Sequence, residues 1–270
     1  MSKILALDLD ETLLSSDKTI SDDNINALGN LLDAGHYIAI DTGRPIHGIQ
    51  KLLEPYDIFK NKNVFFLGYQ GVVGYNACDG SRLFTDYIDS KKAASLIEAI
   101  VAENTTALAF DEKWIYTFEE NSNVLKYNEI THEPVKYIKS TDELLDKKIC
   151  KCMAVDFDSY DNLLSVEEKL TPVFGKDYNI MFSTPTFLEF VKTGASKGHG
   201  LYLLADRLGV DMANTVACGD ERNDISMVVE AGVGVAVANA QEDVHAVADY
   251  ITKMDNNHGA IAEVVYKYFL

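Results

Sequence analysis

The fold is decided at the start of the chain, by the stretch Lys3-Ile4-Leu5-Ala6-Leu7-Asp8-Leu9-Asp10-Glu11-Thr12-Leu13. Four consecutive apolar residues, Ile4 to Leu7, are typical of a strand that is buried on both faces, as in a parallel sheet. Asp8 and Asp10 follow at once, and alternation along an extended chain starts both side chains on the same side. Ligands of open α/β sheets bind at the carboxyl ends of strands, where two close carboxylates need a cation, a proton or a hydrogen-bond donor. The alternative interpretation is an exposed turn with helix-capping aspartates.

The next thirty residues follow a strand–helix–strand pattern. Ser21 is a candidate N-cap, apolar residues recur after it at helical spacing, and Gly35 is expected to end the helix. A second buried strand, His36 to Ile40, then leads into Asp41-Thr42-Gly43-Arg44. Such units are almost always right-handed and parallel, so the sequence predicts that this second loop shares a sheet edge with Asp8.

From about residue 83 the alternating pattern stops. A helix and several short β-like runs lead to a further strand at 187–191, which predicts an α+β insert with its own antiparallel sheet. We therefore expect an α/β fold with two domains. A Rossmann-like parallel-sheet core would comprise 1–82 and 191–270, and an inserted α+β domain would comprise 83–190. Residues 68–80, rich in Gly, Asn and Tyr, are expected to form a loop or a hairpin.

The α/β pattern resumes after the insert. Ser196-Lys197-Gly198 precedes a helix, and Thr215 to Cys218 is a short buried strand that ends in Gly219-Asp220-Glu221-Arg222-Asn223-Asp224. Strand ends and helix starts of one parallel sheet meet at one edge. The order of the elements therefore predicts that Lys197 and Asp220 lie at the edge that carries Asp8.

Composition narrows the possible partners. Of the 270 residues, 47% are hydrophobic, which is enough for a core, and the formal charge is 24 − 42 = −18. Such a charge argues against non-specific binding to nucleic acid or to an anionic membrane, both of which need a basic face. An anionic substrate would need a local cluster of positive charge and backbone N–H groups.

The cellular compartment is inferred from the segments and residues that are missing. The chain has neither an apolar run of transmembrane length nor a signal segment at Met1, so we expect a cytoplasmic protein. Its cysteines are then expected to be free thiols: Cys78, Cys150, Cys152 and Cys218. The pair around Lys151 favours a buried strand over a metal site, because no second Cys or His pair lies nearby in the sequence.

Four separated groups of polar residues thus point to one sheet edge. Asp8 and Asp220 offer hard oxygen ligands suited to Mg²⁺. A phosphate dianion needs a cation, a fixed ammonium such as Lys197, a hydroxyl such as Thr42, and backbone N–H groups at a helix start. A carboxylate can attack phosphorus to form an acyl-phosphate, while a second carboxyl group protonates the leaving oxygen and then deprotonates water. Any one group alone is more often a helix cap, a turn residue or a surface charge.

Together the motifs resemble those of the haloacid dehalogenase superfamily of phosphatases, in particular its sugar-phosphatase-like branch with a large α+β cap, the Cof-type hydrolases. The resemblance covers nearly the whole chain and rests on four motifs in the family's order: Asp8-Leu9-Asp10-Glu11-Thr12, Thr42-Gly43-Arg44, Ser196-Lys197-Gly198 and Gly219-Asp220-Glu221-Arg222-Asn223-Asp224. It implies a core domain, a C2-type cap that closes over the site and selects the leaving group, and Mg²⁺ as cofactor.

The resemblance also implies roles for the matching residues. Asp8 would be the nucleophile that forms a phospho-aspartate. Asp10 would be the general acid and base, with its backbone carbonyl on Mg²⁺. Asp220 would ligate the metal directly, and Asp224 directly or through water. The phosphoryl group would be held by the backbone of Leu9 and by Thr42, Gly43, Lys197 and Asn223. Alternatively, Asn223 would orient Lys197.

Three positions depart from the family pattern. Glu11 stands where Gly is usual, so its side chain must point away from the phosphate or be held by a cation. Asp41 stands where a small or apolar residue is commoner, and Tyr69-Gln70-Gly71 replaces a usual Asn-Gly near the substrate. Candidate substrate contacts in the cap are Lys113, Trp114, Tyr116 and Glu189, although large aromatic residues are more often core.

The leading hypothesis is a Mg²⁺-dependent phosphatase that hydrolyses a small phosphorylated metabolite such as a sugar phosphate, a nucleotide or a cofactor phosphate. One alternative is a phosphotransferase or mutase that uses the same phospho-aspartate. The other is a non-catalytic sensor of a phosphorylated ligand, against which the presence of both Asp8 and Asp10 argues. The sequence leaves the oligomeric state and the identity of the substrate open.

Overall fold

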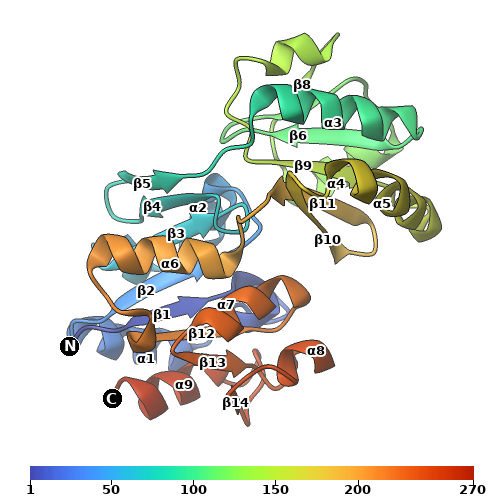
Figure 1. Cartoon of the computed structure of the whole chain (residues 1–270). Coiled ribbons are helices and arrows are strands. Elements are labelled where there is room, and N and C mark those ends of the chain that lie inside the picture. The colour runs from blue at the N-terminus through green and yellow to red at the C-terminus, as the bar shows by residue number, and fades with distance from the viewer. The chain divides into compact units, whose positions relative to one another are not determined.

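The computed structural model describes residues 1–270 and divides them into two compact units. The first unit comprises Met1–Thr85 and Ser196–Leu270, and the second comprises Asp86–Ala195. The second unit is therefore one continuous insertion between two segments of the first (Figure 1). None of the helices combines the length and the apolar character needed to span a bilayer.

The first unit is built on an eight-stranded sheet, with the predicted opening strand near its middle. β1 (Ile4–Leu7) lies between β12 (Thr215–Gly219) and β2 (Tyr37–Asp41) and is parallel to both. The other strands are β3 (Val64–Gly68), β4 (Val73–Asn76), β5 (Arg82–Thr85), β13 (Val233–Ala236) and β14 (Tyr250–Ile251). Their order is β14-β13-β12-β1-β2-β3-β4-β5. The pairs β3–β4 and β4–β5 are antiparallel, and all other pairs are parallel.

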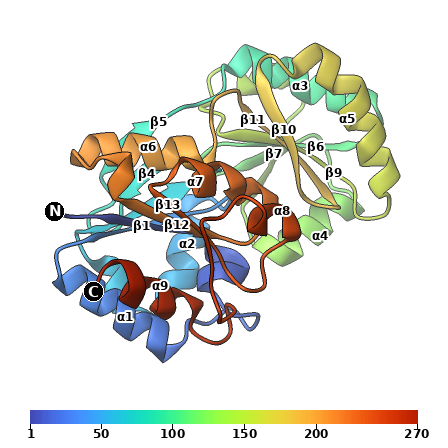
Figure 2. The ribbon, with the colours of Figure 1, turned by 60° about the horizontal axis from the view of Figure 1, so that its bottom comes forward.

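Helices cover both faces of this sheet (Figures 1 and 2). They are α1 (Asp22–Asp33), α2 (Ile46–Leu53), α6 (Lys197–Leu208), α7 (Ile225–Glu230), α8 (Glu242–His245) and α9 (Ala260–Tyr268). Leu5 and Leu7 belong to the core shared with α1, α2 and α9, while Ile4 and Ala6 belong to the core shared with α6 and α7. Because β1 alternates between two apolar layers, a run of four apolar residues is required there.

The second unit has a six-stranded sheet of its own. Its strands are β6 (Thr106–Phe110), β7 (Ile115–Thr117), β8 (Val135–Tyr137), β9 (Lys151–Val155), β10 (Tyr178–Thr184) and β11 (Phe187–Lys192). The order is β10-β11-β9-β6-β7-β8, and all pairs are antiparallel except β7 with β8. α3 (Ser90–Ala102) and α5 (Tyr160–Phe174) share one apolar core with this sheet. The ring of Tyr127, from α4 (Ser122–Thr131), packs edge-on against Phe110 and Phe187.

The predicted α/β pattern is confirmed. Ser21 caps α1 by accepting a hydrogen bond from Asn24 N, and residues 68–80 contain a hairpin in which β4 pairs with β3. The sequence analysis does not predict α4 or β8. α4 buries only Val124 and Tyr127, so it lacks the apolar stripe that marks a helix, and the three-residue edge strand β8 is mostly exposed.

A close contact between two glycines joins the β3–β4 turn to α6. Gly71 has a φ of +79°, and a Cβ at this position would lie 2.4 Å from Ser196 O. A Cβ at Gly200 would lie 2.6 Å from Gly71 Cα. The turn and the start of α6 can approach this closely only because neither residue has a side chain.

We predict that Gly71→Ala destabilises the protein much more than Gly35→Ala. Gly35 also has a positive φ, +83°, but a Cβ there would meet no atom within 4 Å. The left-handed backbone alone costs an alanine about 1–2 kcal/mol. The steric overlap at Gly71 adds to this strain, for a total of roughly 2–5 kcal/mol. Urea unfolding of both variants measures the difference, and equal losses of stability would contradict the proposed contact.

Candidate active site

Neighbouring strands of the first unit end in acidic residues. Asp8 follows β1, Asp220 follows β12, and Asp41 is the last residue of β2. Asp8 N donates a 3.0 Å hydrogen bond to Cys218 O, which extends the pairing of β1 with β12 to Asp8. The parallel register thus brings three carboxyl groups from distant parts of the sequence to one sheet edge.

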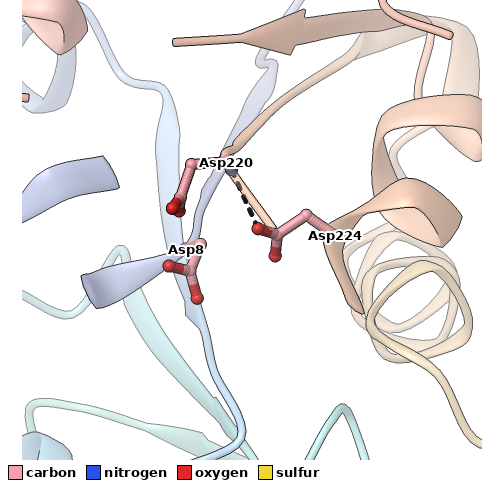
Figure 3. Close-up of side chains that lie close together, drawn as sticks. All are labelled: Asp8, Asp220 and Asp224. Atoms are coloured by element: carbon pink, nitrogen blue, oxygen red, sulfur yellow. Dashed lines mark hydrogen bonds between the residues drawn. The ribbon is translucent and has the colours of Figure 1, made fainter. Parts of the chain in front are cut away.

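Asp8, Asp220 and Asp224 form a buried acidic cluster (Figure 3). One carboxylate oxygen from each residue lies within 4.8 Å of the others. Asp224 Oδ2 accepts 2.9 Å hydrogen bonds from the backbone N–H groups of Asp220 and Glu221, which fixes the loop after β12. The Thr12 hydroxyl donates to Asp220 Oδ1 at 2.7 Å and ties the first loop to the last.

Lys197 supplies the positive charge of this cluster. Its side chain is completely buried, and its Nζ lies 2.5 Å from both Asp8 Oδ1 and Asp224 Oδ1. Ser196 accepts a 3.0 Å hydrogen bond from His199 N and so begins α6 at Lys197. Burial alone would lower the pKa of Lys197, but the carboxylates of Asp224, Asp8 and Asp41 raise it, so the ammonium stays charged.

The acidic cluster carries more negative charge than Lys197 can neutralise. Burial, with the charges of Asp224 and Asp220, raises the pKa of Asp8 well above its ordinary value, although Lys197 opposes the shift. Burial and Asp224 raise the pKa of Asp220 to about 7. Three converging carboxylates with only one ammonium are a donor set that fits a hard divalent cation such as Mg²⁺.

Asp10 points to a different set of partners. Its two carboxylate oxygens accept hydrogen bonds from Arg44 Nε at 2.6 Å and Arg44 Nη2 at 2.9 Å, and Lys18 Nζ lies 3.1 Å away. Burial would raise the pKa of Asp10, but the hydrogen bond and charge of Arg44, together with Lys18, lower it. The Asp10 carboxylate is therefore held ionised in this conformation.

Glu11 is accommodated by its backbone and by its partners. Its φ of +55° lies in the left-handed region that favours glycine, which explains why Gly is usual here in the family it resembles. The side chain accepts hydrogen bonds from Lys18, Ser16 and Asn256, at 3.0–3.1 Å. Of the two arrangements expected for Glu11, the structure shows the one in which a cation, Lys18, holds the carboxylate.

The loop after β2 is fixed by backbone hydrogen bonds. Thr42 N donates to Leu67 O at 3.0 Å, and Thr42 O accepts from Gln70 N at 3.1 Å. The Thr42 side chain is buried, and its hydroxyl accepts a 3.3 Å hydrogen bond from Arg44 N. Gln70 Oε1 in turn accepts a 3.3 Å hydrogen bond from Asn223 Nδ2. The second and fourth motifs are thus joined through the β3–β4 turn.

Comparison with known proteins identifies the family to which this chain belongs. Residues 5–265 match the model of a family described as haloacid dehalogenase-like hydrolase. The chain belongs to this family. A Streptococcus pyogenes serotype M6 protein, M6_Spy0533, is 31% identical over 282 residues, an alignment that covers 99% of this chain and 98% of the relative. A crystal structure of a haloacid dehalogenase-like hydrolase from Bacteroides thetaiotaomicron superposes with a TM-score of 0.86, at 29% identity and 100% coverage of both chains.

A further relative has a defined activity in its name. The 5-amino-6-(5-phospho-D-ribitylamino)uracil phosphatase YcsE of Bacillus subtilis is 30% identical over 263 residues, covering 95% of this chain and 92% of the relative. Family membership and relatives of this kind make the present haloacid dehalogenase-like hydrolase a phosphatase.

The structure brings most of the sequence-predicted site residues of this hydrolase together. Asp8, Lys197, Asp220 and Asp224 meet in the buried cluster, and the turn Leu9–Leu13 that contains Leu9 and Asp10 starts directly beside it. The carboxylate that holds Lys197 beside Asp8 is Asp224, whereas the side-chain amide of Asn223 donates a hydrogen bond to Gln70. Thr42 and Gly43 lie on the neighbouring loop after β2.

Sequence analysis assigned no role to several residues that organise the site. Thr12 holds Asp220, while Arg44 and Lys18 hold Asp10. Thr12 and Arg44 lie inside recognised motifs, so their position in the motif was the available signal. Lys18 lies in an exposed turn with no distinguishing pattern, and only the folded loop brings it to Asp10.

The four candidate contacts in the insert lie in different surroundings within the second unit. Tyr116 is buried in its apolar core and donates a 2.6 Å hydrogen bond to Asp111 Oδ2. Glu189 is buried and lies 3.1 Å from Lys151 Nζ. Trp114 and Lys113 are exposed. The core interpretation therefore holds for Tyr116.

Asp41 is a buried carboxyl group without a hydrogen-bond partner at either oxygen. Burial raises the pKa of Asp41 well above its ordinary value, Asp224 and Asp8 raise it further, and Lys197 opposes them. A carboxyl group with a raised folded-state pKa favours folding most below its unfolded-state pKa. That contribution is lost as pH rises through the folded-state pKa. At neutral pH the unfolded chain exposes this carboxylate to water, so its burial without a partner is unfavourable for folding.

We predict that Asp41→Asn increases the free energy of unfolding at pH 7, measured in a chelator, by roughly 1 kcal/mol or more, because the unfavourable burial of an ionisable carboxyl group without partners is removed. The gain should shrink as the pH falls toward 4, close to the unfolded-state pKa of about 3.9, because the aspartate is then protonated in the folded state and increasingly protonated in the unfolded state. Urea unfolding at pH 4, 5.5 and 7 measures this dependence. A gain that is the same at every pH would contradict an ionisation effect.

Proposed function

We propose that this phosphatase is Mg²⁺-dependent and hydrolyses a small phosphorylated metabolite through a phospho-aspartate on Asp8. The observation that carries the proposal is the buried pairing of Lys197 with Asp8 and Asp224, beside Asp220. A carboxylate at the end of a parallel strand, held by an ammonium and open to a cation, is suited to attack on a phosphate ester.

The reaction divides into two steps. In the first, an Asp8 oxygen forms a bond to phosphorus as the bond between phosphorus and the ester oxygen breaks. Asp10 gives its proton to the departing alkoxide. In the second, Asp10 removes a proton from water, the water oxygen attacks the phosphorus of the phospho-aspartate, and Asp8 leaves as a carboxylate. Phosphate and an alcohol are the products, and both aspartates return to their starting states.

The phosphoryl group would be bound by groups of opposite or complementary charge. Lys197 neutralises one of its oxygens, while the Thr42 hydroxyl and the backbone N–H groups of Leu9 and Gly43 donate to others. Asn223 adds a side-chain amide. These donors matter more than usual here because the protein carries a net charge of −18, which repels a dianion at long range.

Asp8, Asp220 and Asp224 would hold Mg²⁺, together with the backbone carbonyl of Asp10. Bound there, the metal would neutralise the carboxylates and polarise the phosphoryl oxygens. The backbone hydrogen bonds to Asp224 Oδ2 and the Thr12 hydroxyl on Asp220 would hold these carboxylates in place for the cation.

The hydrogen bonds of Asp10 define what must change during the cycle. Arg44 and Lys18 hold this side chain ionised, which is the form that takes a proton from water. To act as an acid in the first step, Asp10 must lose part of this cationic contact and gain a proton. Binding of the substrate phosphate offers competing anionic oxygens to Arg44 and so favours that change.

We propose a small metabolite as substrate, and the second unit, Asp86–Ala195, as the cap that selects its leaving group. The strong negative charge supports a small ligand over nucleic acid or a membrane surface. YcsE, at 30% identity over nearly the whole chain, is named for a phosphorylated ribityl compound. This name supports the first compounds to be assayed: pentitol, sugar and nucleotide phosphates.

We predict that Asp8→Asn abolishes Mg²⁺-dependent release of phosphate from p-nitrophenyl phosphate. The rate should fall by on the order of 10³-fold or more, as expected when a nucleophile is removed. The fold should be retained, because an amide of the same size replaces the carboxylate and Asp224 still pairs with Lys197. Circular dichroism checks the fold. Equal phosphate release by both proteins would favour the ligand sensor, and transfer of the phosphoryl group to an added sugar would favour the phosphotransferase.

We also predict that a chelator removes the activity and that Mg²⁺ restores it. Mg²⁺ should raise the melting temperature of the wild type, because a ligand that binds only the folded state stabilises it. Asp220→Asn should remove both effects, while Asp206→Asn, at an exposed position on α6, should leave them unchanged. Thermal unfolding with and without Mg²⁺ provides the measurement. An unchanged Mg²⁺ response in Asp220→Asn would contradict the proposed metal site.

A further inference from the structure

The turn Tyr69-Gln70-Gly71 is held between three of the four sequence motifs. Tyr69 N and Gln70 N donate 3.1 Å hydrogen bonds to Arg44 O and Thr42 O. Gly71 packs against the start of α6, which carries Lys197. The turn therefore belongs to the active-site framework, although no residue in it was assigned a role.

The backbone of this turn is strained. Tyr69, Gln70 and Gly71 have φ values of +55°, +62° and +79°, so all three are left-handed. Only Gly71 adopts this region without a steric penalty, and each of the other two raises the free energy of the folded state. Strain of this kind persists where the surrounding structure enforces it, and it is concentrated at functional sites.

The left-handed backbone of this turn directs the Gln70 side-chain amide into the protein. The side chain is 2% exposed, and its Oε1 accepts the hydrogen bond from Asn223 Nδ2. Gln70 Nε2 and Asn223 Oδ1 are both buried without a hydrogen-bond partner. A Cβ at Gly43 would lie 2.7 Å from Gln70 Nε2, so this nitrogen lies directly over Gly43.

The buried NH₂ group of Gln70 is a hydrogen-bond donor that lacks an acceptor. Buried polar groups are nearly always hydrogen-bonded, and leaving one without a partner is unfavourable. The proposed function puts a phosphoryl oxygen beside Gly43, where it accepts from the Gly43 N–H group. We propose that Gln70 Nε2 is a further phosphoryl-binding donor, completing the set formed by Thr42, Gly43 and Lys197.

This assignment, which rests on the proposed function, gives the substitution at the family's usual Asn-Gly position a chemical purpose. A glutamine reaches one methylene further than an asparagine, and its amide binds an anion without adding charge to the crowded cluster. Asn223 then has two roles. It contacts the phosphoryl group itself, and its hydrogen bond to Gln70 Oε1 orients Gln70 Nε2 toward Gly43.

The test measures binding of inorganic phosphate to the full chain in the presence of Mg²⁺, by calorimetry. Gln70→Met keeps the length of the side chain and removes the amide, so phosphate should bind about tenfold more weakly or worse, the loss expected for one hydrogen bond to a charged group. KM for p-nitrophenyl phosphate should rise in parallel. Gln50→Met, at an exposed glutamine on α2, is the matched control and should bind phosphate like the wild type.

A second variant guards against a loss of structure. Gln70→Asn suits a left-handed backbone and keeps an amide, but one methylene shorter, so it should fold and still bind phosphate more weakly. If Gln70→Met does not fold, Gln70→Asn alone decides. Wild-type affinity in the folded variants would overturn the inference while leaving the phosphatase proposal intact. Weaker phosphate binding in a protein that hydrolyses no ester would support the donor and reject the proposed chemistry.

Discussion

The buried ammonium of Lys197, held between Asp8 and Asp224, is the interaction on which the rest of this structure depends. It joins the first strand of the chain to the helix after the insertion and to the loop after β12. Removing one partner of a buried, hydrogen-bonded ion pair costs on the order of 3–5 kcal/mol. In the proposed function the same charge has a second role, because without it the carboxylates would repel a phosphate. Stability and the proposed anion binding then depend on one side chain.

Around this pair the fold controls which carboxylates are ionised. The cluster at the end of β1 and β12 is buried with an excess of negative charge, which raises the pKa values of Asp8 and Asp220. Two residues further on, Asp10 points toward Arg44 and Lys18, and the cations lower its pKa. The turn Leu9–Leu13 produces this separation by sending neighbouring aspartates to different surroundings. Environment, rather than residue type, thus shifts the pKa values of the two aspartates in opposite directions.

Departures from the family pattern become intelligible in the same terms. Glu11 occupies a left-handed position normally given to glycine and compensates with three hydrogen-bond donors. Gln70 occupies a strained turn and leaves an amide over Gly43. Asp41 has no such compensation, since both of its oxygens lack partners. Glu11 is thus held within its loop, Gln70 carries the donor proposed for a phosphoryl oxygen, and Asp41 buries a carboxyl group without partners at the cost of stability.

The sequence by itself determined the main elements of the first unit and their order. The apolar run Ile4–Leu7, the Ser21 cap and the alternating pattern predict the parallel sheet, and the four motifs predict which side chains meet at its edge. Such signals are local, because backbone periodicity and capping are set within a few residues. Only the tertiary structure decided the pairing of Asp10 with Arg44 and Lys18, and of Gln70 with Asn223. These contacts depend on register, turn conformation and side-chain reach between loops, none of which a local pattern encodes.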